Sequence, residues 1–142
     1  MKKRAFCLIF LMASISSFMT EAASKTPESL MCDGRPKISL DQIEGMFSQI
    51  RGNTDWDITG PLLWGYFFTD ADKEPLEKLN TILVGENYQH VGIHFDEVWW
   101  LHVEKVEAHS VSSLNERNLE FYKLAAENDV DCYDGMDVGP RP

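Results

Sequence analysis

Hydrophobic and polar positions change their spacing several times between residue 62 and the end of the chain. Leu62–Thr69 is almost continuously apolar and aromatic, which predicts a central strand buried on both faces. Tyr88–Phe95 and Val98–Val106 alternate with a period of two, as half-buried strands do. Val130–Val138 has the pattern of a last strand, interrupted by Gly135. The pattern therefore predicts four strands.

Helical spacing fills the two segments that separate these strands. The first helix has N-cap candidates at Asp70–Asp72 and ends near Gly85. The second spans Ser110–Asp129, and Ser113 and Glu116 have the spacing of a capping box. The residues that we expect to face the sheet are Leu76, Leu79, Ile82 and Leu83 in the first helix, and Leu114, Phe121, Leu124 and Ala125 in the second.

The order strand, helix, strand, strand, helix, strand predicts an α/β (α+β) fold of the ferredoxin-like type. In this split βαβ sandwich, a four-stranded antiparallel sheet carries both helices on one face. Ile38–Ile50 is amphipathic and has Ser39 as an N-cap candidate, which predicts a short N-terminal helix outside the main domain. We expect this helix to cover part of the other sheet face, where large aromatic side chains would otherwise be exposed.

The first residues have the three features of a secretory signal peptide. Met1–Arg4 is basic, the stretch from Ala5 to about Met19 is apolar, and small residues follow at positions 22–24. The apolar stretch is shorter than the roughly 20 residues that span a bilayer, so we expect no stable membrane anchor. The mature protein is then predicted to be periplasmic or secreted. A misassigned start, with Met31 as the first residue, is the cytoplasmic alternative.

These features divide the chain into three parts. Residues 1–23 are the signal peptide, residues 24–55 hold a linker and the short amphipathic helix, and residues 56–140 form the domain. One domain of this size has a modest hydrophobic core.

The charge of the chain is strongly acidic. The net charge is −10, and removing residues 1–22 lowers the basic count from 13 to 10 and the acidic count from 23 to 22, leaving −12. Such a surface repels phosphate backbones, so direct contact with nucleic acid is not expected. A basic protein partner or a metal ion would be attracted instead.

Two cysteines, Cys32 and Cys132, remain after removal of the signal peptide. In an oxidising compartment they could form a disulfide that ties the N-terminal arm to the last strand. The alternative is a pair of free thiols. Export favours the disulfide, although sequence alone does not fix the geometry that a disulfide requires.

Four segments resemble the recurring segments of the ribonuclease E inhibitor RraB-like family, in their usual order. They are Pro61-Leu-Leu-Trp-Gly-Tyr-Phe-Phe, Trp99-Trp-Leu-His-Val-Glu, Ser113-Leu-Asn-Glu-Arg-Asn and Tyr133-Asp-Gly-Met-Asp-Val-Gly-Pro. The resemblance covers residues 56–140 and implies a ferredoxin-like fold. It also implies a non-catalytic regulator that binds ribonuclease E, with no cofactor of its own.

Acidic residues beside Gly135 are the first candidates for a partner-binding site. Asp134 and Asp137 could receive an Arg or Lys of a partner, or a metal ion. The structural alternative is a bulge or tight turn, in which Gly135 supplies the backbone freedom and the carboxylates cap local amides.

A second candidate cluster lies on the strand predicted at Val98–Val106. Trp100, His102 and Glu104 share one of its faces because alternate residues point the same way. With Asp137 or His94 as a third ligand, His102 and Glu104 could form the site of a small metal-dependent hydrolase. A hydrogen-bonded pair on a half-buried face is the more common use of such residues, and no nucleophile with a nearby base stands out.

Other polar residues have structural interpretations. We expect Arg117 to pair with Asp134 or Asp137 across the helix–sheet interface, and Glu107–His109 to be a connector. The leading prediction of function is an exported, non-enzymatic domain that binds a protein partner, possibly a basic one, through its sheet face and acidic rim. The alternatives are a cytoplasmic inhibitor of ribonuclease E and the small hydrolase.

Overall fold

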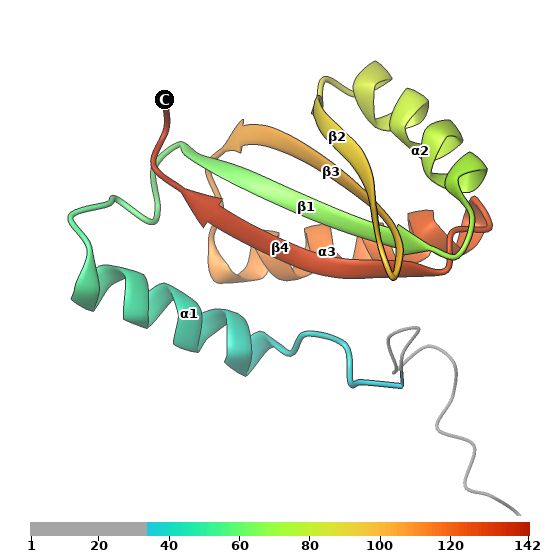
Figure 1. Cartoon of the computed structure of the whole chain (residues 1–142). Coiled ribbons are helices and arrows are strands. Elements are labelled where there is room, and N and C mark those ends of the chain that lie inside the picture. The colour runs from blue at the N-terminus through green and yellow to red at the C-terminus, as the bar shows by residue number, and fades with distance from the viewer. Residues whose placement is uncertain (1–33) are drawn as a thin grey trace, which may run out of the picture.

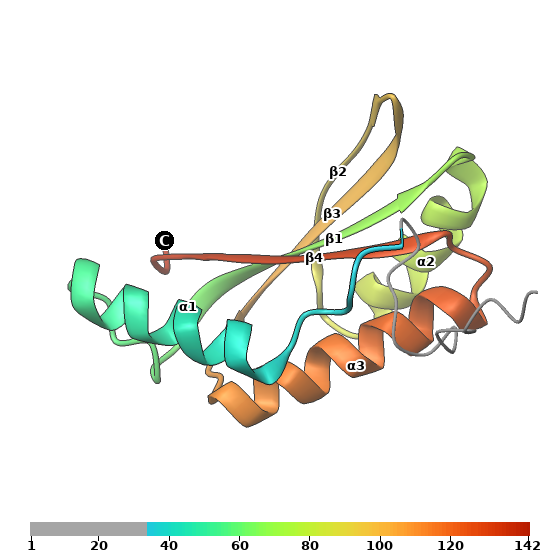
Figure 2. The same ribbon diagram turned by 90° about the horizontal axis from the view of Figure 1, so that it is seen from below.

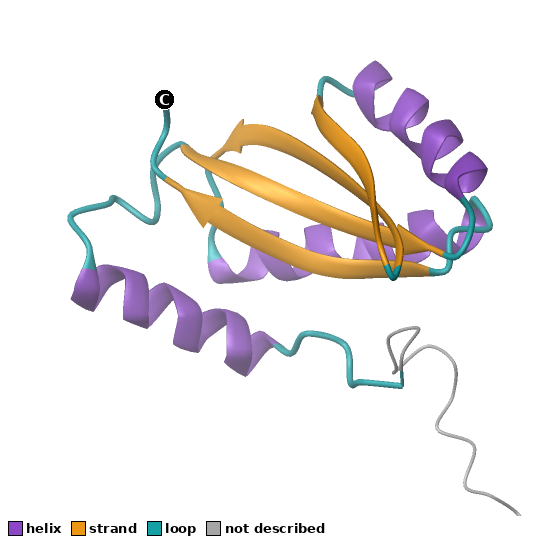
Figure 3. Ribbon diagram, in the orientation of Figure 1, coloured by secondary structure: helices purple, strands orange, loops and turns teal. Residues whose placement is uncertain are grey.

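The structure is a computed structural model that describes residues 34–142. The signal peptide, the Met31 start and Cys32 lie outside these residues. The described part of the chain forms three helices and four strands (Figures 1 and 3): α1 (Leu40–Asn53), β1 (Leu62–Asp70), α2 (Lys73–Gly85), β2 (Gln89–Asp96), β3 (Val98–Glu107), α3 (Val111–Glu127) and β4 (Cys132–Gly139). Within residues 34–142, no helix has the length and apolar character needed to cross a membrane.

The sheet has the strand order β2-β3-β1-β4, and each neighbouring pair is antiparallel. Helices α2 and α3 lie on one side of it, and the hairpin that joins β2 to β3 curls away from that side (Figure 2). This arrangement confirms the predicted ferredoxin-like, split βαβ fold. Because β1 and β3 are the inner strands, the loop that follows β1 and the hairpin that precedes β3 meet at one end of the sheet.

Strand β1 separates two different environments. Trp64, Tyr66 and Phe68 point toward the helices and are fully buried, whereas the alternating residues Leu63 and Phe67 on the other side are only half-buried. The predicted burial of β1 on both faces is therefore corrected to burial on one face. Burying each of these large side chains stabilises the fold by roughly 1.5–3 kcal/mol.

Helix α1 belongs to the same core, and its predicted position is corrected. The ring of Phe47 stacks on Trp64 with centroids 6.3 Å apart, and Ile43 is buried with it. α1 lies beside α3 on the helix side of the sheet (Figures 1 and 2), so it is not outside the domain and does not cover the other face. An amphipathic pattern predicts that a helix buries one side, but it does not say against which surface.

The helix starts follow local hydrogen-bond chemistry. Ser39 caps α1 as predicted, and Gln42 completes a capping box. Helix α3 also begins with a capping box, but its members are Ser110 and Ser113, not the predicted Ser113 and Glu116. The serine at the third helical position returns a hydrogen bond as a glutamate would, which shifts the cap by one turn.

Candidate functional site

The sheet face opposite the helices is the candidate functional site, and we call it the open face. No described helix lies on it (Figure 2). Strand register places these residues there: Leu63, Phe67, Thr69, Trp100, His102, Glu104, Val106 and Asp137. Four of the five predicted partner-binding residues, Trp100, His102, Glu104 and Asp137, are therefore brought together on this face.

Gly65 lies at the centre of the open face. A Cβ atom at this position would be 2.9 Å from Nε2 of His102 and closer still to Oδ1 of Asp137, which is nearer than real Cβ contacts occur. The missing side chain of Gly65 therefore lets the His102 imidazole and the Asp137 carboxylate close over β1. The sequence predicts His102 beside Glu104 with Asp137 or His94 as the third residue, and the pairing of β4 with β1 brings in Asp137.

His102 is held by contacts on two sides. Its ring stacks on Phe67 at 4.4 Å between centroids, and Nε2 lies 3.4 Å from Oε1 of Glu104. Nε2 is buried and makes no conventional hydrogen bond. Across residues 34–142, no three His, Cys, Asp or Glu side chains are grouped so that they could hold a metal ion. His94, one of the two predicted third ligands, stacks on Trp100 instead of joining His102 and Glu104.

A β-bulge lies at the edge of the open face, in β4. The register with β1 shifts between Phe67 and Phe68, so that Asp134 is an extra residue, and Gly135 has φ +114°. This confirms the predicted bulge and its need for glycine. The Asp134 carboxylate does not cap a local amide but accepts a hydrogen bond from Nη2 of Arg35 at 2.8 Å.

Cys132 is the first residue of β4 and is disulfide-bonded. Its predicted partner, Cys32, lies outside the described residues. The pairing of these two cysteines therefore stays a prediction, while the side chain of Cys132 is buried where β4 begins.

Arg117 has a different partner from the one predicted. Its Nη1 donates to both carboxylate oxygens of Glu107 at 2.9 Å, and it also hydrogen-bonds the hydroxyl of Tyr88. Asp137 projects from the open face, on the other side of the sheet from α3, and Asp134 is engaged by Arg35. The expected Arg117 pairs with Asp134 or Asp137 are therefore wrong, although the structural role of Arg117 is retained.

Glu107, which the sequence predicts to lie in a simple connector, is the centre of a polar network. Its carboxylate accepts from the Tyr66 hydroxyl at 2.9 Å and lies 3.2 Å from Nε2 of His109, which is buried with 6% of its surface exposed. Nδ1 of His109 lies 3.0 Å from Oγ of Ser113 in the first turn of α3. The network thus joins β1, β3 and α3.

The electrostatics of this network stabilise an ionised carboxylate. Burial alone would raise the pKa of Glu107, but hydrogen bonds from His109, Arg117 and Tyr66 outweigh it and lower the pKa to about 2. Burial and the negative charge of Glu107 raise the pKa of Tyr66, which keeps this hydroxyl a donor. Two sequence signals pointed to the network: a tyrosine on a buried strand needs a partner for its hydroxyl, and Arg117 falls on the same helical stripe as Leu114 and Phe121.

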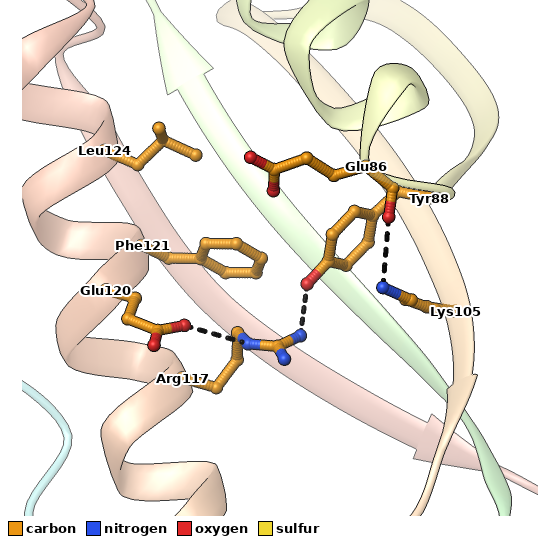
Figure 4. Close-up of a pocket in the computed structure, with 7 residues that line it drawn as sticks. All are labelled: Glu86, Tyr88, Lys105, Arg117, Glu120, Phe121 and Leu124. Carbon is orange, nitrogen blue, oxygen red and sulfur yellow. Dashed lines mark hydrogen bonds and ion pairs between the residues drawn. The ribbon is translucent and has the colours of Figure 1, made fainter.

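A pocket of about 280 Å³ opens beside this network, between α3 and the β2–β3 side of the sheet (Figure 4). Its cations are already engaged, because Nζ of Lys105 donates to the carbonyl oxygen of Glu86 at 3.1 Å and Nε of Arg117 donates to Glu120 at 3.2 Å. Lys105 also lies over the Tyr88 ring at 4.4 Å. We assign these side chains a structural role, in which they hold the helices against the sheet.

The fold and the site together define a small α+β domain, with helices on one side of its sheet and an aromatic and acidic surface on the other. The chain belongs to the RraB family: the family model described as "Regulator of ribonuclease activity B" matches residues 40–138. This match confirms the resemblance seen in the sequence, and it includes α1. Members of this family are regulators rather than enzymes. Neither the curated proteins nor the solved structures gave a match.

Proposed function

We propose that this chain is a non-catalytic regulatory domain that binds a protein partner through its open face. The observation that carries the proposal is a sheet face with no described helix over it, on which Trp100, Phe67 and Val106 lie beside the carboxylates of Glu104 and Asp137. Phe67 and Trp100 are half-buried, and partly exposed aromatic residues are frequent anchors of protein interfaces. Membership of a family of ribonuclease regulators supports binding rather than catalysis.

The charge of the open face favours a basic partner. Glu104 and Asp137 lie at its centre and Asp134 at its edge, in a chain whose net charge is −10. Opposite charges speed encounter, and added salt should slow it. The same field opposes the approach of a phosphate backbone, so the proposed partner is a protein and not RNA.

Two features of the chain favour different locations for this binding. The signal-peptide pattern at residues 1–23 favours a periplasmic or secreted partner, which is the leading proposal. Family membership favours ribonuclease E as the second candidate. Cell fractionation with mass spectrometry of the mature N-terminus separates them, since a mature N-terminus near residue 24 in the periplasmic fraction is expected only with export. Full-length protein in the cytoplasm would overturn the export proposal.

Site-specific photo-crosslinking tests the face. A photoreactive amino acid is placed at Val106 on the open face or at Leu119 on the outer side of α3, positions with similar exposure of 45% and 52%. We expect a specific adduct from position 106 and none from position 119. The captured protein is then purified and its binding measured directly. Adducts of equal yield from both positions, or from position 119 alone, would contradict the assignment of the binding face.

Charge reversal with purified proteins tests the mode of binding. Asp137→Lys places a positive charge on the open face, and Glu44→Lys makes the same change on exposed α1. With the captured partner, or with ribonuclease E, we expect Asp137→Lys to weaken binding about tenfold and Glu44→Lys to change it less than about twofold. For ribonuclease E, the rate of RNA cleavage in the presence of each variant is the second measurement. Equal effects of the two substitutions would mean that net charge alone, and not the open face, accounts for the binding.

A further inference from the structure

One end of the open face is concave, where β1 ends and β3 and β4 begin. A pocket of about 540 Å³ opens there. Thr69 is paired with Trp100 on β3 and with Cys132 on β4, so these strands form its floor. Among the other lining residues are Glu97, Asp131, Asp134 and Arg35. This cavity combines an aromatic wall with carboxylates from three different segments.

A guanidinium group already occupies one part of this rim. Nη2 of Arg35, from the segment before α1, lies 2.8 Å from Oδ1 of Asp134. Arg35 is the single basic residue among the described lining residues, whereas four are acidic. This ion pair shows that the rim accepts a guanidinium, and no second basic residue stands among the described lining residues to pair with the other carboxylates.

Two carboxylates remain able to accept further hydrogen bonds. Asp131 uses Oδ2 to cap the backbone amide of Ala71 at 3.0 Å, and within residues 34–142 nothing hydrogen-bonds its Oδ1. Glu97 follows the end of β2 in the hairpin with φ +62°, is exposed, and makes no hydrogen bond or ion pair with the described residues. Glu97, in the β2–β3 hairpin, and Asp131, just before β4, therefore both supply unused negative charge to the same pocket.

The ring of Trp100 is fixed in place. Its Nε1 donates to the carbonyl oxygen of Asp96 at 3.3 Å, and the His94 ring lies nearly parallel to it, with centroids 6.4 Å apart. An indole ring attracts a cation on its face by about 0.5–2 kcal/mol, depending on how far the pair is removed from water. Because the ring does not need to be ordered on binding, little conformational entropy opposes this contact.

We propose that this pocket is the binding site for an arginine side chain of the protein partner, whose guanidinium stacks on Trp100 and pairs with Glu97 and Asp131. The inference rests on the proposed function and specifies the side chain that the open face selects. Arginine fits better than lysine, because a planar guanidinium can stack and hydrogen-bond two carboxylates at once. An ammonium group offers only a compact charge.

A peptide probe tests the pocket without knowledge of the partner. The probe is a nine-residue peptide of alternating glycine and arginine, compared with the same peptide carrying citrulline or lysine. Binding to the full mature chain is followed by NMR of the indole N–H of Trp100 and by calorimetry. We expect a saturable shift of this signal with the arginine peptide. Affinity should fall about tenfold or more with citrulline, which keeps the shape but loses the charge, and about threefold with lysine.

Matched variants assign the effect to the pocket. Glu97→Gln removes one pocket carboxylate and Glu44→Gln removes one on exposed α1, so both lower the negative charge equally. We expect Glu97→Gln to lower the affinity for the arginine peptide about threefold and Glu44→Gln to leave this affinity unchanged. Trp100→Leu should weaken it further, with folding checked by circular dichroism. Equal binding of the arginine and citrulline peptides, or equal effects of the two Gln variants, would overturn the proposal.

The outcomes for the pocket and for the open face can be separated. If Asp137→Lys weakens binding of the partner while Glu97→Gln and Trp100→Leu do not, the open face binds a partner but the pocket is not its arginine-binding site. If the arginine peptide binds the pocket and crosslinking at Val106 captures nothing, arginine binding by the pocket is confirmed and the proposed function of the open face fails. A dimer in sedimentation that Glu97→Gln dissociates would assign the pocket to a second copy, which also overturns the proposal.

Discussion

Arg117 in α3 and Glu107 at the end of β3 form an ion pair in which Nη1 lies 2.9 Å from both carboxylate oxygens. The pair is largely buried, with 21% and 13% of the two side chains exposed. Tyr66 in β1 and His109 in the loop before α3 contact the same carboxylate, so Glu107 has partners from three segments of the chain. A buried charge with this many partners holds α3 in register against the sheet. Removing one partner is destabilising, because the remaining buried polar groups are then incompletely paired.

Substitution of Glu107 by Gln should lower the free energy of unfolding by about 3 kcal/mol at pH 7. The pKa of this carboxyl falls from its ordinary value of 4.5 to about 2 on folding, a difference worth about 3 kcal/mol. Because the pKa is lowered, this stabilisation is complete above about pH 5 and is lost as the pH falls toward 2. Urea unfolding of both proteins from pH 7 to pH 2.5 measures it.

The difference between wild type and the Gln variant should shrink to about half by pH 3. Glu44→Gln, on the exposed surface of α1, is the control and should change stability by less than about 0.5 kcal/mol. A loss at Glu107 that does not depend on pH would show that shape, and not ionisation, accounts for its contribution.

Removing the hydroxyl of Tyr66 should weaken the same network by a smaller amount. Tyr66→Phe deletes the donor that lies 2.9 Å from Oε2 of Glu107, at an expected cost of about 1–2 kcal/mol. The pKa of Glu107 should then rise, because one of the hydrogen bonds that lowers it is gone. Carbon-detected NMR titration of the carboxyl group measures this. An unchanged pKa would mean that Arg117 and His109 are sufficient to keep the pKa of Glu107 low.

Gly65 should be intolerant of a side chain for a steric reason. In Gly65→Ala the new Cβ would collide with the Asp137 carboxylate and the His102 ring, and both would have to leave the centre of the open face. We expect a loss of about 1–3 kcal/mol and shifted NMR signals of His102. Gly92→Ala on β2, where a Cβ meets nothing within 4 Å, is the matched control and should change stability by less than about 1 kcal/mol. Equal losses in the two variants would contradict the crowding at Gly65.

The disulfide of Cys132 should connect to Cys32 and stabilise the mature chain. Peptide mapping without reduction should recover the two cysteine-containing peptides as one linked species. A disulfide closing a loop of this length contributes up to about 4–5 kcal/mol in the chain-entropy model, and strain makes the real value smaller. Reduction should therefore lower the melting temperature, and Cys132→Ser should melt like the reduced protein. A melting temperature that does not respond to reduction would contradict a structural role.

The predicted elements depended on local patterns, and these are largely correct. The apolar run at Leu62–Thr69 became the inner strand β1, and the alternation at Val98–Val106 placed Trp100, His102 and Glu104 on one face. The turn chemistry around Gly135 produced the predicted bulge. Each of these follows from the geometry of a few consecutive residues.

Partners distant in the sequence were the part that local patterns missed. Arg117 could be recognised as a structural residue, but its pairing with Glu107 depends on where β3 ends beneath α3. Likewise α1 has an apolar stripe whatever surface it covers, and only its contact with Trp64 places it on the helix side of the sheet.

The amino-acid sequence by itself determined the strands, the helices, their order and hence the ferredoxin-like topology, because hydrophobic period and capping act over a few residues. Tertiary structure decided that the sheet face opposite the helices stays open and that Asp137, and not His94, joins His102 over Gly65. It also gathered Trp100, Glu97 and Asp131 around one pocket. These relationships come from strand register and chain reversal across the sheet, which depend on the packing of the whole domain.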